Sequence, residues 1–528
     1  MNRRIRLLGA VLLVCFGVLF LQLNNYQVLQ ASSLQNNSRQ PRSPVNLYLL
    51  PRGDILSADS SVLAYSKPTR DGYGQQRYYP PGTANMFAGI TGYYSAAVDA
   101  ATGIESEYDN YLAQHETAVD SLGQLFTQHK VVSDIKLTVS VVLQQDAQNA
   151  LLQAEATFHS TTGSVVALDP QTGAILAMYG NPTFDPNQLV VHSYKKVNAN
   201  AAAIQKLPGC QAGASPLNNG PVSCTFLPGS SFKVIDTAGI FDHKPPMALH
   251  YWPPVSSIGP LPDSTQHLRN YGGEVCGGNL PEILYRSCDT AYAEVGMDLG
   301  AQALHDEAAS FGFNSRPPID LPNPPSYREV AWSNFPSIQS LLPGGTLGTP
   351  GLAYSAIGQE NVTATALQMA MVAGAIGNNG VMMTPHLLDH VISNDGVVTT
   401  TYKPHAWRRS TSAKTAAEVR KLMLGVTQNP AGTANGVFSG SYQVAAKTGT
   451  AETTQCSTNN WLIAFAPAGP GQTPTVAVAA VVPTTTFGCA GTTETTGARV
   501  AGPVVATVLQ DALAQQAAQQ AAGQATKR

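Results

Sequence analysis

The chain has 528 residues, enough for two or more domains and a sizeable hydrophobic core. Charged residues make up only 12% of it, against about 25% in an average soluble protein. Because 30 Lys and Arg nearly balance 33 Asp and Glu, the net charge is −3, which predicts no nucleic-acid partner.

The N-terminus combines a basic start with an apolar run. Three arginines within residues 1–6 precede an uncharged stretch over residues 7–21. With its flanks this stretch reaches about 28 Å as a helix, close to the ~30 Å hydrocarbon core of a bilayer. We therefore expect a cytoplasmic tail over residues 1–6 and a single transmembrane anchor over residues 7–23, with the rest on the outer side of the cell membrane. A cleaved signal peptide has the same layout and is the alternative.

Residues 24–158 are expected to form an N-terminal domain of mixed structure, after a polar juxtamembrane linker. The sequence YLLPRGDILSADSSVLAYS indicates short strands with turns at Arg52-Gly53 and Ser60-Ser61. Two later segments, GIESEYDNYLAQ and VLQQDAQNALLQAEATF, have the apolar spacing of helices.

A second domain is expected over residues 159–515. Near its start, TGSVVALDPQTGAILAMYGNP predicts two strands joined by a turn. Near its end, YQVAAKTGTAE, NWLIAFAP and TVAVAAVV predict three further strands, and RVAGPVVATVLQDAL predicts a helix. With helices between these two groups, the pattern predicts an α+β fold with one sheet assembled from both ends of the domain. The Gln- and Ala-rich residues 516–528 are expected to be a fraying helix end or disordered.

The cysteines fit an oxidising compartment. One of the 7 lies in the predicted anchor, and the other six lie on the predicted outer side. They can pair in several ways, and joining sequence neighbours gives Cys210–Cys224, Cys276–Cys288 and Cys456–Cys489. The sequence contains no C-x-x-C, H-E-x-x-H, Walker A or G-x-G-x-x-G pattern, so we expect neither a metal nor a cofactor.

A serine and a lysine follow a Pro-Gly turn in the sequence TFLPGSSFKV. Ser230 stands at a predicted helix start, and Lys233 follows three residues later. Taken alone, this serine is better explained as a helix cap than as a nucleophile. Another Ser-x-x-Lys, which spans Ser193 to Lys196, has no such turn before it.

Two more motifs follow in order. Ser287-Cys288-Asp289 lies in the helical-looking segment LPEILYRSCDTAYAEVG, and Lys447-Thr448-Gly449-Thr450 lies in a predicted strand. On its own, the Lys447-Thr448-Gly449-Thr450 motif is explained by an ordinary lysine on an edge strand. Ser457-Thr458-Asn459 matches the middle motif better in letters but comes after Lys447, in the wrong order. Three ordered motifs in suitable contexts indicate a catalytic site.

The chemistry explains why these residue types occur together. A serine hydroxyl is a weak nucleophile and needs a base within reach. Because residues three apart share a helix face, Lys233 is expected to hydrogen-bond Ser230 Oγ. The helix N-terminus, burial and a second cation, Lys447, are expected to lower the pKa of Lys233, so that its neutral amine takes the proton.

The motif set resembles that of the penicillin-binding proteins and class A β-lactamases. The chain as a whole resembles the class B penicillin-binding proteins, most of all the actinobacterial penicillin-binding protein A type. RGDILSADSSVLA is similar to the Arg-Gly-x-Ile motif that opens the family's pedestal, and GIESEYDNYL to its Gly-Leu-Glu…Tyr-Asp segment. SVVALDPQTGAILAM, FLPGSSFKV, IGQENVTATALQMAMVAGAIGNNG and VAAKTGTAE follow the transpeptidase domain in order.

The resemblance implies a fold and a reaction. The fold would be a transpeptidase domain of the serine β-lactamase and penicillin-binding-protein type, with a central antiparallel five-stranded sheet, behind a pedestal of dimerisation type. The reaction would be peptidoglycan D,D-transpeptidation: Ser230 attacks a stem pentapeptide, D-Ala leaves, and an amine of a neighbouring stem takes the acyl group. β-Lactam antibiotics would acylate the same serine. Cell-wall synthesis, division and cell shape would depend on the enzyme, with a membrane-embedded glycan polymerase as its partner.

The resemblance also implies roles for the motif residues. Beside the nucleophile Ser230, Lys233 would be the base, while Ser287 and Lys447 would relay protons. The substrate would be bound by four further residues, Asp289, Thr448, Gly449 and Thr450.

One position departs from the family pattern. The middle motif usually ends in Asn, whose amide donates to the substrate backbone, whereas this chain has Asp289. An ionised carboxylate cannot donate a hydrogen bond. It would instead accept from Lys233 or from a substrate N–H, or the site would hold a shifted pKa.

Two other functions are compatible with the same serine. A serine β-lactamase would also have to deacylate rapidly with water, and the long segment over residues 24–158 argues against it because free β-lactamases carry no pedestal. A catalytically degenerate β-lactam-binding scaffold is the other alternative, and Asp289 is the feature that leaves it open.

Overall fold

The computed structural model describes residues 7, 12–20, 22, 51–71, 74–113, 132–211, 213–322, 329–453, 457–484 and 495–525. Residues 12–20 are helical, and within these described ranges no helix combines the length and apolar composition needed to cross a membrane. Several residues of the predicted anchor over 7–23 lie outside the described residues, as do both cysteines of the predicted Cys456–Cys489 pair. The anchor and this pair therefore stay predictions.

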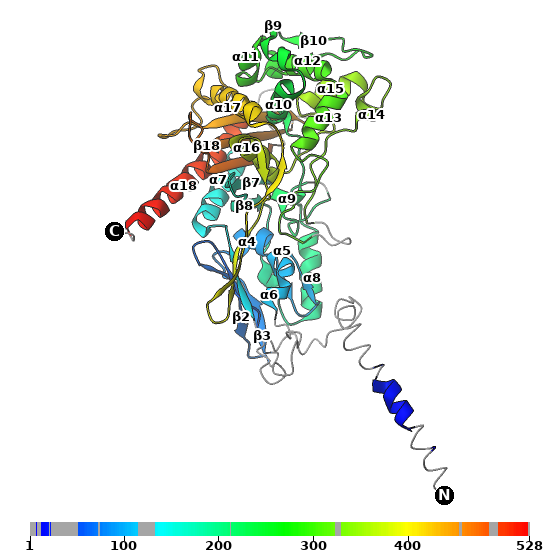
Figure 1. Cartoon of the computed structure of the whole chain (residues 1–528), viewed down its shortest axis with the longest axis vertical. Helices are drawn as coiled ribbons and strands as arrows, with labels where there is room; N and C mark the ends of the chain where they lie inside the picture. Colours follow the sequence, from blue (N-terminus) through cyan, green and yellow to red (C-terminus); the bar gives the residue numbers. More distant parts are fainter. Residues whose placement is uncertain are drawn as a thin grey trace. The chain divides into compact units, whose positions relative to one another are not determined.

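A five-stranded sheet forms the core of the second half of the fold. Its order is β17-β18-β19-β7-β8, and every neighbouring pair is antiparallel. Strands β7 and β8 form the predicted hairpin, and β17, β18 and β19 come from the predicted C-terminal segments (Figure 1). The prediction of one sheet assembled from both ends of the domain is therefore confirmed. The strands are β7 (Gly163–Leu168), β8 (Ile175–Asn181), β17 (Ala445–Glu452), β18 (Thr458–Ala466) and β19 (Val476–Thr484).

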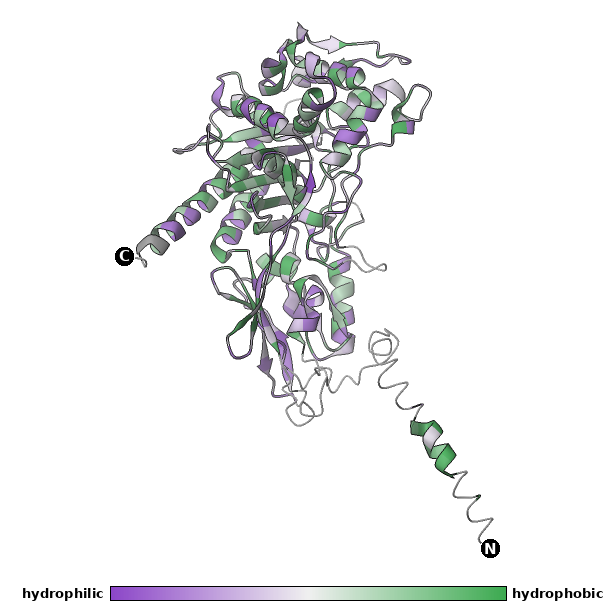
Figure 2. Cartoon of the chain, in the orientation of Figure 1, coloured by the Kyte–Doolittle hydropathy of each residue, from purple (hydrophilic) through white to green (hydrophobic). Residues whose placement is uncertain are grey.

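Both faces of this sheet are covered, because side chains alternate between them along each strand. In β18, Trp461, Ile463 and Phe465 pack on the same side as α16 (Ala366–Gly377), whereas Leu462 and Ala464 pack toward α7 (Val141–Phe158) and α18 (Gly497–Ala525). Figure 2 shows the amphipathic character of α18, whose hydrophobic and hydrophilic residues alternate along its length. The helix continues to Ala525, so residues 516–525 of the predicted tail are helical.

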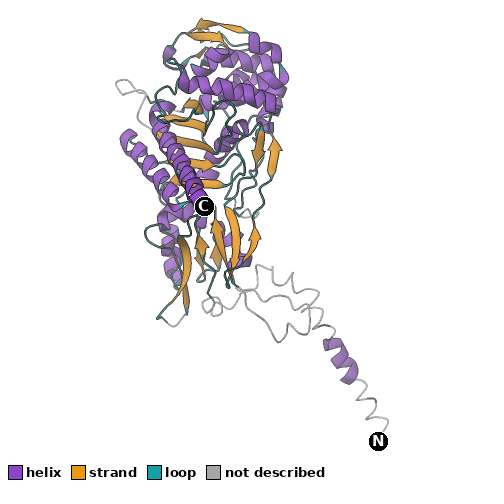
Figure 3. Cartoon of the chain, turned by 60° about the vertical axis from the view of Figure 1, so that its left-hand side comes forward, coloured by secondary structure: helices purple, strands orange, loops and turns teal. Residues whose placement is uncertain are grey.

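Helices fill the chain between β8 and β17, as the sequence predicted, and most of them gather beyond one end of the sheet (Figures 1 and 3). They are α8 (Tyr194–Gln205), α9 (Gly220–Ser223), α10 (Lys233–His243), α11 (Leu280–Tyr285), α12 (Asp289–Leu299), α13 (Ala301–Ser310), α14 (Ile338–Leu341), α15 (Gly348–Ala356), α16 and α17 (Ala413–Gln428). Short strands also occur here: β9 (Tyr251–Val255), β10 (Ser257–Ile258), β11 (Leu268–Arg269), β12 (Cys276–Asn279), β13 (Val381–Met383) and β16 (Ala406–Arg409).

A second sheet of six strands combines segments from both predicted domains. Its order is β15-β14-β6-β1-β2-β3. The N-terminal segment supplies β1 (Ile55–Leu56), β2 (Val62–Pro68), β3 (Gln75–Tyr78) and β6 (Ser133–Leu137), while β14 (Leu388–Ser393) and β15 (Val398–Thr401) come from the later one. Helix α7, which precedes residue 159, packs on the five-stranded sheet of the later domain. Each predicted domain therefore contributes elements to the structure of the other. The boundary between residues 158 and 159 stays a prediction.

A buried ionic cluster joins the two N-terminal segments that the sequence singled out. Glu105, fully buried in α5 (Gly103–Glu107), accepts from Arg52 Nε at 3.1 Å, from Arg77 Nε at 2.5 Å and from Tyr79 Oη at 3.0 Å. Arg52 Nη1 also donates to Asp109 in α6 (Asp109–Leu112) at 2.6 Å. Glu105 thus pairs with both guanidinium groups while Asp109 supplies the second negative charge, which ties α5 to the strands around it.

Two of the three nearest-neighbour cysteine pairs are disulfides, Cys210–Cys224 and Cys276–Cys288. The second connects β12 to the residue before α12, and so fastens the loop that contains Ser287.

Candidate active site

Ser230 lies on a tight turn packed directly against β17. It belongs to the 3-10 helix η4 (Gly229–Phe232), immediately before α10, rather than to the α-helix itself. Gly229 has a φ of 53°, and a Cβ there would meet Thr450 O at 2.7 Å. A Cβ on Gly449 would meet Pro228 O at 2.5 Å. These two glycines therefore allow the serine turn to approach the strand.

Asp289 lies between Ser230 and Lys233. Ser230 Oγ donates to Asp289 Oδ1 at 3.3 Å, and Lys233 Nζ donates to the same oxygen at 2.6 Å. The predicted hydrogen bond from Ser230 to Lys233 is therefore wrong for this structure, because the carboxylate takes the bonds of both side chains. Of the alternatives open for Asp289, acceptance from Lys233 is the one observed.

Ser287 occupies a break between two helices. Helix α11 ends at Tyr285, α12 begins at Asp289, and Ser287 has a φ of 65°. The expectation that this motif lies inside one continuous helix is therefore wrong. A left-handed residue cannot continue a right-handed helix, and the break directs Ser287 Oγ toward Lys447 Nζ at 2.7 Å and Lys233 Nζ at 3.5 Å.

The two lysines are fully buried and differ in their partners. Burial lowers the pKa of Lys233, and the Asp289 carboxylate opposes that shift. Burial, followed by the nearby positive charge of Lys233, lowers the pKa of Lys447 well below its ordinary value. The sequence predicted that Lys447 lowers the pKa of Lys233, whereas here it is the charge of Lys233 that lowers the pKa of Lys447. Lys447 donates to Ser287 Oγ and to Thr448 O at 3.0 Å, and no carboxylate of the described residues forms an ion pair with it.

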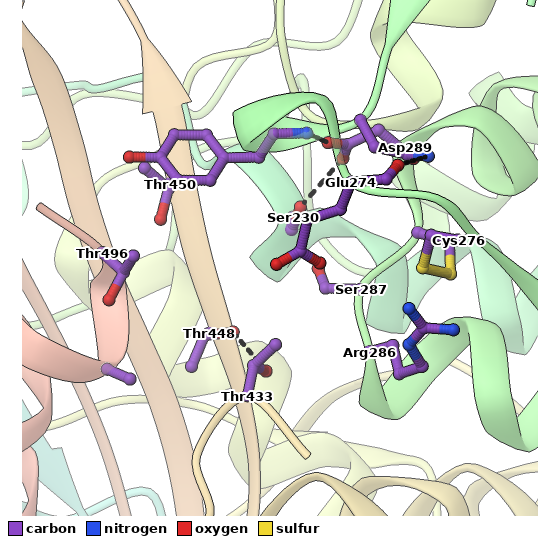
Figure 4. A pocket seen from close by; sticks show the side chains of 14 residues that line it. Ser230, Glu274, Cys276, Arg286, Ser287, Asp289, Thr433, Thr448, Thr450 and Thr496 are labelled. Atoms are coloured by element: carbon purple, nitrogen blue, oxygen red, sulfur yellow. Dashed lines mark hydrogen bonds between the residues drawn. A yellow bond between two sulfur atoms is a disulfide. The ribbon is translucent and has the colours of Figure 1, made fainter. Parts of the chain in front are cut away.

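Ser230 lines a cavity of about 220 Å³. Figure 4 shows Ser230 between two walls, with Thr448, Thr450 and Thr496 on one side and Cys276 and Arg286 on the other. The lining residues are Ser230, Asn270, Tyr271, Glu274, Cys276, Arg286, Ser287, Cys288, Asp289, Thr433, Thr448, Thr450, Thr496 and Ala498. Of the predicted site residues, five line the cavity, and Lys233, Lys447 and Gly449 lie behind its wall.

Several lining residues were not predicted from the sequence. Thr433 and Thr448 share a hydrogen bond between their hydroxyls at 2.7 Å, and the Tyr271 backbone N–H donates to Asp289 Oδ2 at 3.1 Å. Thr433 lies in a turn and Tyr271 begins the short 3-10 helix η6 (Tyr271–Gly273), and neither segment is long enough to show periodicity or a motif. A backbone N–H group, moreover, is present whatever the residue type, so the sequence does not show that it will act as a donor.

Comparison with known proteins identifies the class of this fold and site. The family model described as the penicillin binding protein transpeptidase domain matches residues 163–510, and that of the penicillin binding protein A dimerisation domain matches residues 52–133. The chain belongs to the penicillin-binding protein transpeptidase family.

Individual relatives are similar along nearly the whole chain. The peptidoglycan D,D-transpeptidase PbpA of Mycolicibacterium smegmatis is 34% identical over 498 residues, which cover 91% of this chain and 94% of the relative. PbpA of Mycobacterium tuberculosis is 32% identical over 528 residues, with coverages of 97% and 99%. The crystal structure of penicillin-binding protein A from M. tuberculosis matches with a TM-score of 0.73 at 32% identity, over 88% of this chain and 99% of that one. Its penicillin G acyl-enzyme complex matches with a TM-score of 0.72, at 32% identity and with coverages of 88% and 99%.

Proposed function

We propose that the chain is a serine-type peptidoglycan D,D-transpeptidase that works through an acyl-enzyme on Ser230. The observation that carries this proposal is the connected hydrogen-bond network that runs from Ser230 Oγ through Asp289, Lys233 and Ser287 to Lys447. This network supplies a nucleophile, a proton acceptor and a route for returning the proton, which are the groups that acyl transfer requires.

In the proposed reaction, Ser230 Oγ attacks the carbonyl carbon of the penultimate D-Ala in a stem pentapeptide. The new C–O bond forms, the C–N bond to the terminal D-Ala breaks, and the leaving nitrogen takes a proton through Ser287. An amine of a second stem then displaces the serine and forms the cross-link. Thr448 and Thr450, on the wall across from Arg286, provide hydroxyls for the terminal carboxylate.

β-Lactams would acylate the same serine, because opening the lactam ring is also an attack on an amide carbonyl. The acyl-enzyme complexes of M. tuberculosis penicillin-binding protein A with imipenem and with penicillin G support this part of the proposal. Such an enzyme would serve cell-wall synthesis, and with it division and cell shape.

The proposal includes a membrane location. The apolar residues 7–23 behind a basic start favour a single anchor with the catalytic domain outside the cell. An anchor would hold the active site near newly made glycan, so a membrane-embedded glycan polymerase is the partner that we propose.

Two assays on the predicted ectodomain, which is the chain from residue 24 onward, test the function. Incubation with a stem pentapeptide and an amine acceptor is expected to release D-Ala and to form a cross-linked product. With nitrocefin we expect one stoichiometric, stable adduct. Continuous nitrocefin hydrolysis would instead show a β-lactamase, and a stable adduct without D-Ala release would show a binding scaffold.

A further inference from the structure

Asp289 is held rigidly at the centre of the hydrogen-bond network. Its Oδ1 atom accepts from Ser230 Oγ and from Lys233 Nζ, while Oδ2 accepts from the Tyr271 backbone N–H at 3.1 Å. Both carboxylate oxygens therefore accept hydrogen bonds, one of them from the continuous η4–α10 segment and the other from the backbone at Tyr271. Ser230 is the donor whose proton must leave during catalysis.

Lys233 has the bonding pattern of a cation. Its Nζ atom donates to Asp289 Oδ1 at 2.6 Å, to Ser287 O at 2.8 Å and to Ser287 Oγ at 3.5 Å. An ammonium group has three N–H donors and no acceptor, so these three contacts use its full capacity. All three bonds go to Asp289 and Ser287 and none goes to Ser230, whose hydroxyl is bonded to the carboxylate instead. Lys447, by contrast, has two acceptors, Ser287 Oγ and Thr448 O, as a neutral amine needs.

We propose that the Asp289 carboxylate, rather than the Lys233 amine, accepts the proton of Ser230 in this enzyme. The proposal rests on the proposed function and concerns the position where the family usually has Asn. An asparagine amide in that place cannot take a proton, whereas a carboxylate can. Asp289 is then a catalytic residue, because it contacts the nucleophilic oxygen, and Lys233 is the cation that pairs with it.

The proton transfers in this proposal balance without any further reactant. As the Ser230 Oγ–carbon bond forms, its proton passes to Asp289 Oδ1. As the C–N bond breaks, Ser287 delivers its own proton to the leaving nitrogen and takes one from Lys233, and the Lys233 amine left neutral then takes the proton held by Asp289. Each transfer within the protein follows a hydrogen bond of the network. The serine loses one proton and the leaving amine gains one, and the charges of the site are unchanged.

The charged groups around Asp289 determine how the reaction should depend on pH. Lys233 from α10 and Lys447 from β17 face it, and Glu274 and Arg286 line the same cavity. Asp236, fully buried one turn along α10 from Lys233, has a pKa raised well above its ordinary value by burial, so its charged form is disfavoured. In this proposal the Asp289–Lys233 pair reacts as a carboxylate and an ammonium, the forms that an ion pair 2.6 Å apart favours. Lys233 could act as the base only after its ammonium group had lost a proton.

The decisive experiment is the pH profile of penicillin G acylation for the ectodomain and its Asp289→Asn variant. For the native protein, the second-order rate constant should change by less than about threefold between pH 6 and 9, because its acceptor already carries the negative charge. In Asp289→Asn the carboxylate is gone and Lys233 has to act as the base, so the rate constant should rise at least about tenfold with pH over pH 5–9 as the amine deprotonates. Asp263→Asn, which removes an exposed carboxylate outside the cavity, is the matched control and should keep the native profile.

Two profiles of the same shape for native protein and Asp289→Asn would overturn the proposal, whatever their absolute rates. Asp289→Ser is measured alongside, with thermal unfolding of every variant, so that a folding failure of one variant does not end the test. The end-point adduct separates this proposal from the proposed function. If all variants still form one adduct on Ser230 but share one profile, the transpeptidase assignment stands and the role of Asp289 fails.

Discussion

Replacement of Lys233 by alanine is expected to lower the second-order rate constant of penicillin acylation by about 10²–10⁴-fold. The change removes the ammonium that pairs with Asp289 Oδ1 at 2.6 Å and that bridges to Ser287. Without it, an unpaired carboxylate faces Ser230 and the proton cannot reach the leaving nitrogen. The rate is measured by labelling with a fluorescent penicillin over time, and thermal unfolding shows whether the variant is folded.

The second Ser-x-x-Lys sequence provides the control for that experiment. Lys196 stands three residues after Ser193, as Lys233 does after Ser230, but it lies exposed in α8. Lys196→Ala should label at the native rate. Equal labelling rates for Lys233→Ala and the native ectodomain would show that the buried lysine has no part in activating the serine.

Replacement of Glu105 by glutamine is expected to destabilise the ectodomain by about 3–5 kcal/mol. Glu105 is fully buried and binds both Arg52 and Arg77, so the neutral variant leaves two buried guanidinium groups with less compensating charge. Denaturant unfolding measures the loss. Because the cluster lies in the N-terminal segments and none of its members lines the cavity, the folded variant should still be acylated at the native rate.

Glu107→Gln is the matched control, since it removes an exposed carboxylate from the same short helix, α5. It should change the free energy of unfolding by no more than about 0.5 kcal/mol. If Glu105→Gln costs less than about 1 kcal/mol, the buried cluster does not stabilise this part of the fold in the way that loss of a buried ion-pair partner should.

Features with a short sequence period could be predicted, because the residues that determine them are neighbours in the chain. The β7–β8 hairpin, the late strands and α7 all follow from alternation, helical spacing and turn residues. The pairing of β14 with β6 joins segments about 250 residues apart, a separation over which no such period exists.

The site divides in the same way. Ser230, Lys233 and Lys447 could be found because their spacing repeats a known chemical pattern. The break at Ser287 could not, because the apolar spacing of α11 and α12 continues across it and a positive φ leaves no mark in the letters. The position of Asp289 between Ser230 and Lys233 depends on how α12 packs beside α10, which is a property of the folded chain.

Peptide-level mass spectrometry of the ectodomain after treatment with penicillin G tests the nucleophile most directly. We expect a single covalent adduct on the peptide that contains Ser230, and none in the Ser230→Ala variant. An adduct on another serine, such as Ser193, or an adduct that persists in Ser230→Ala, would contradict the assignment of Ser230.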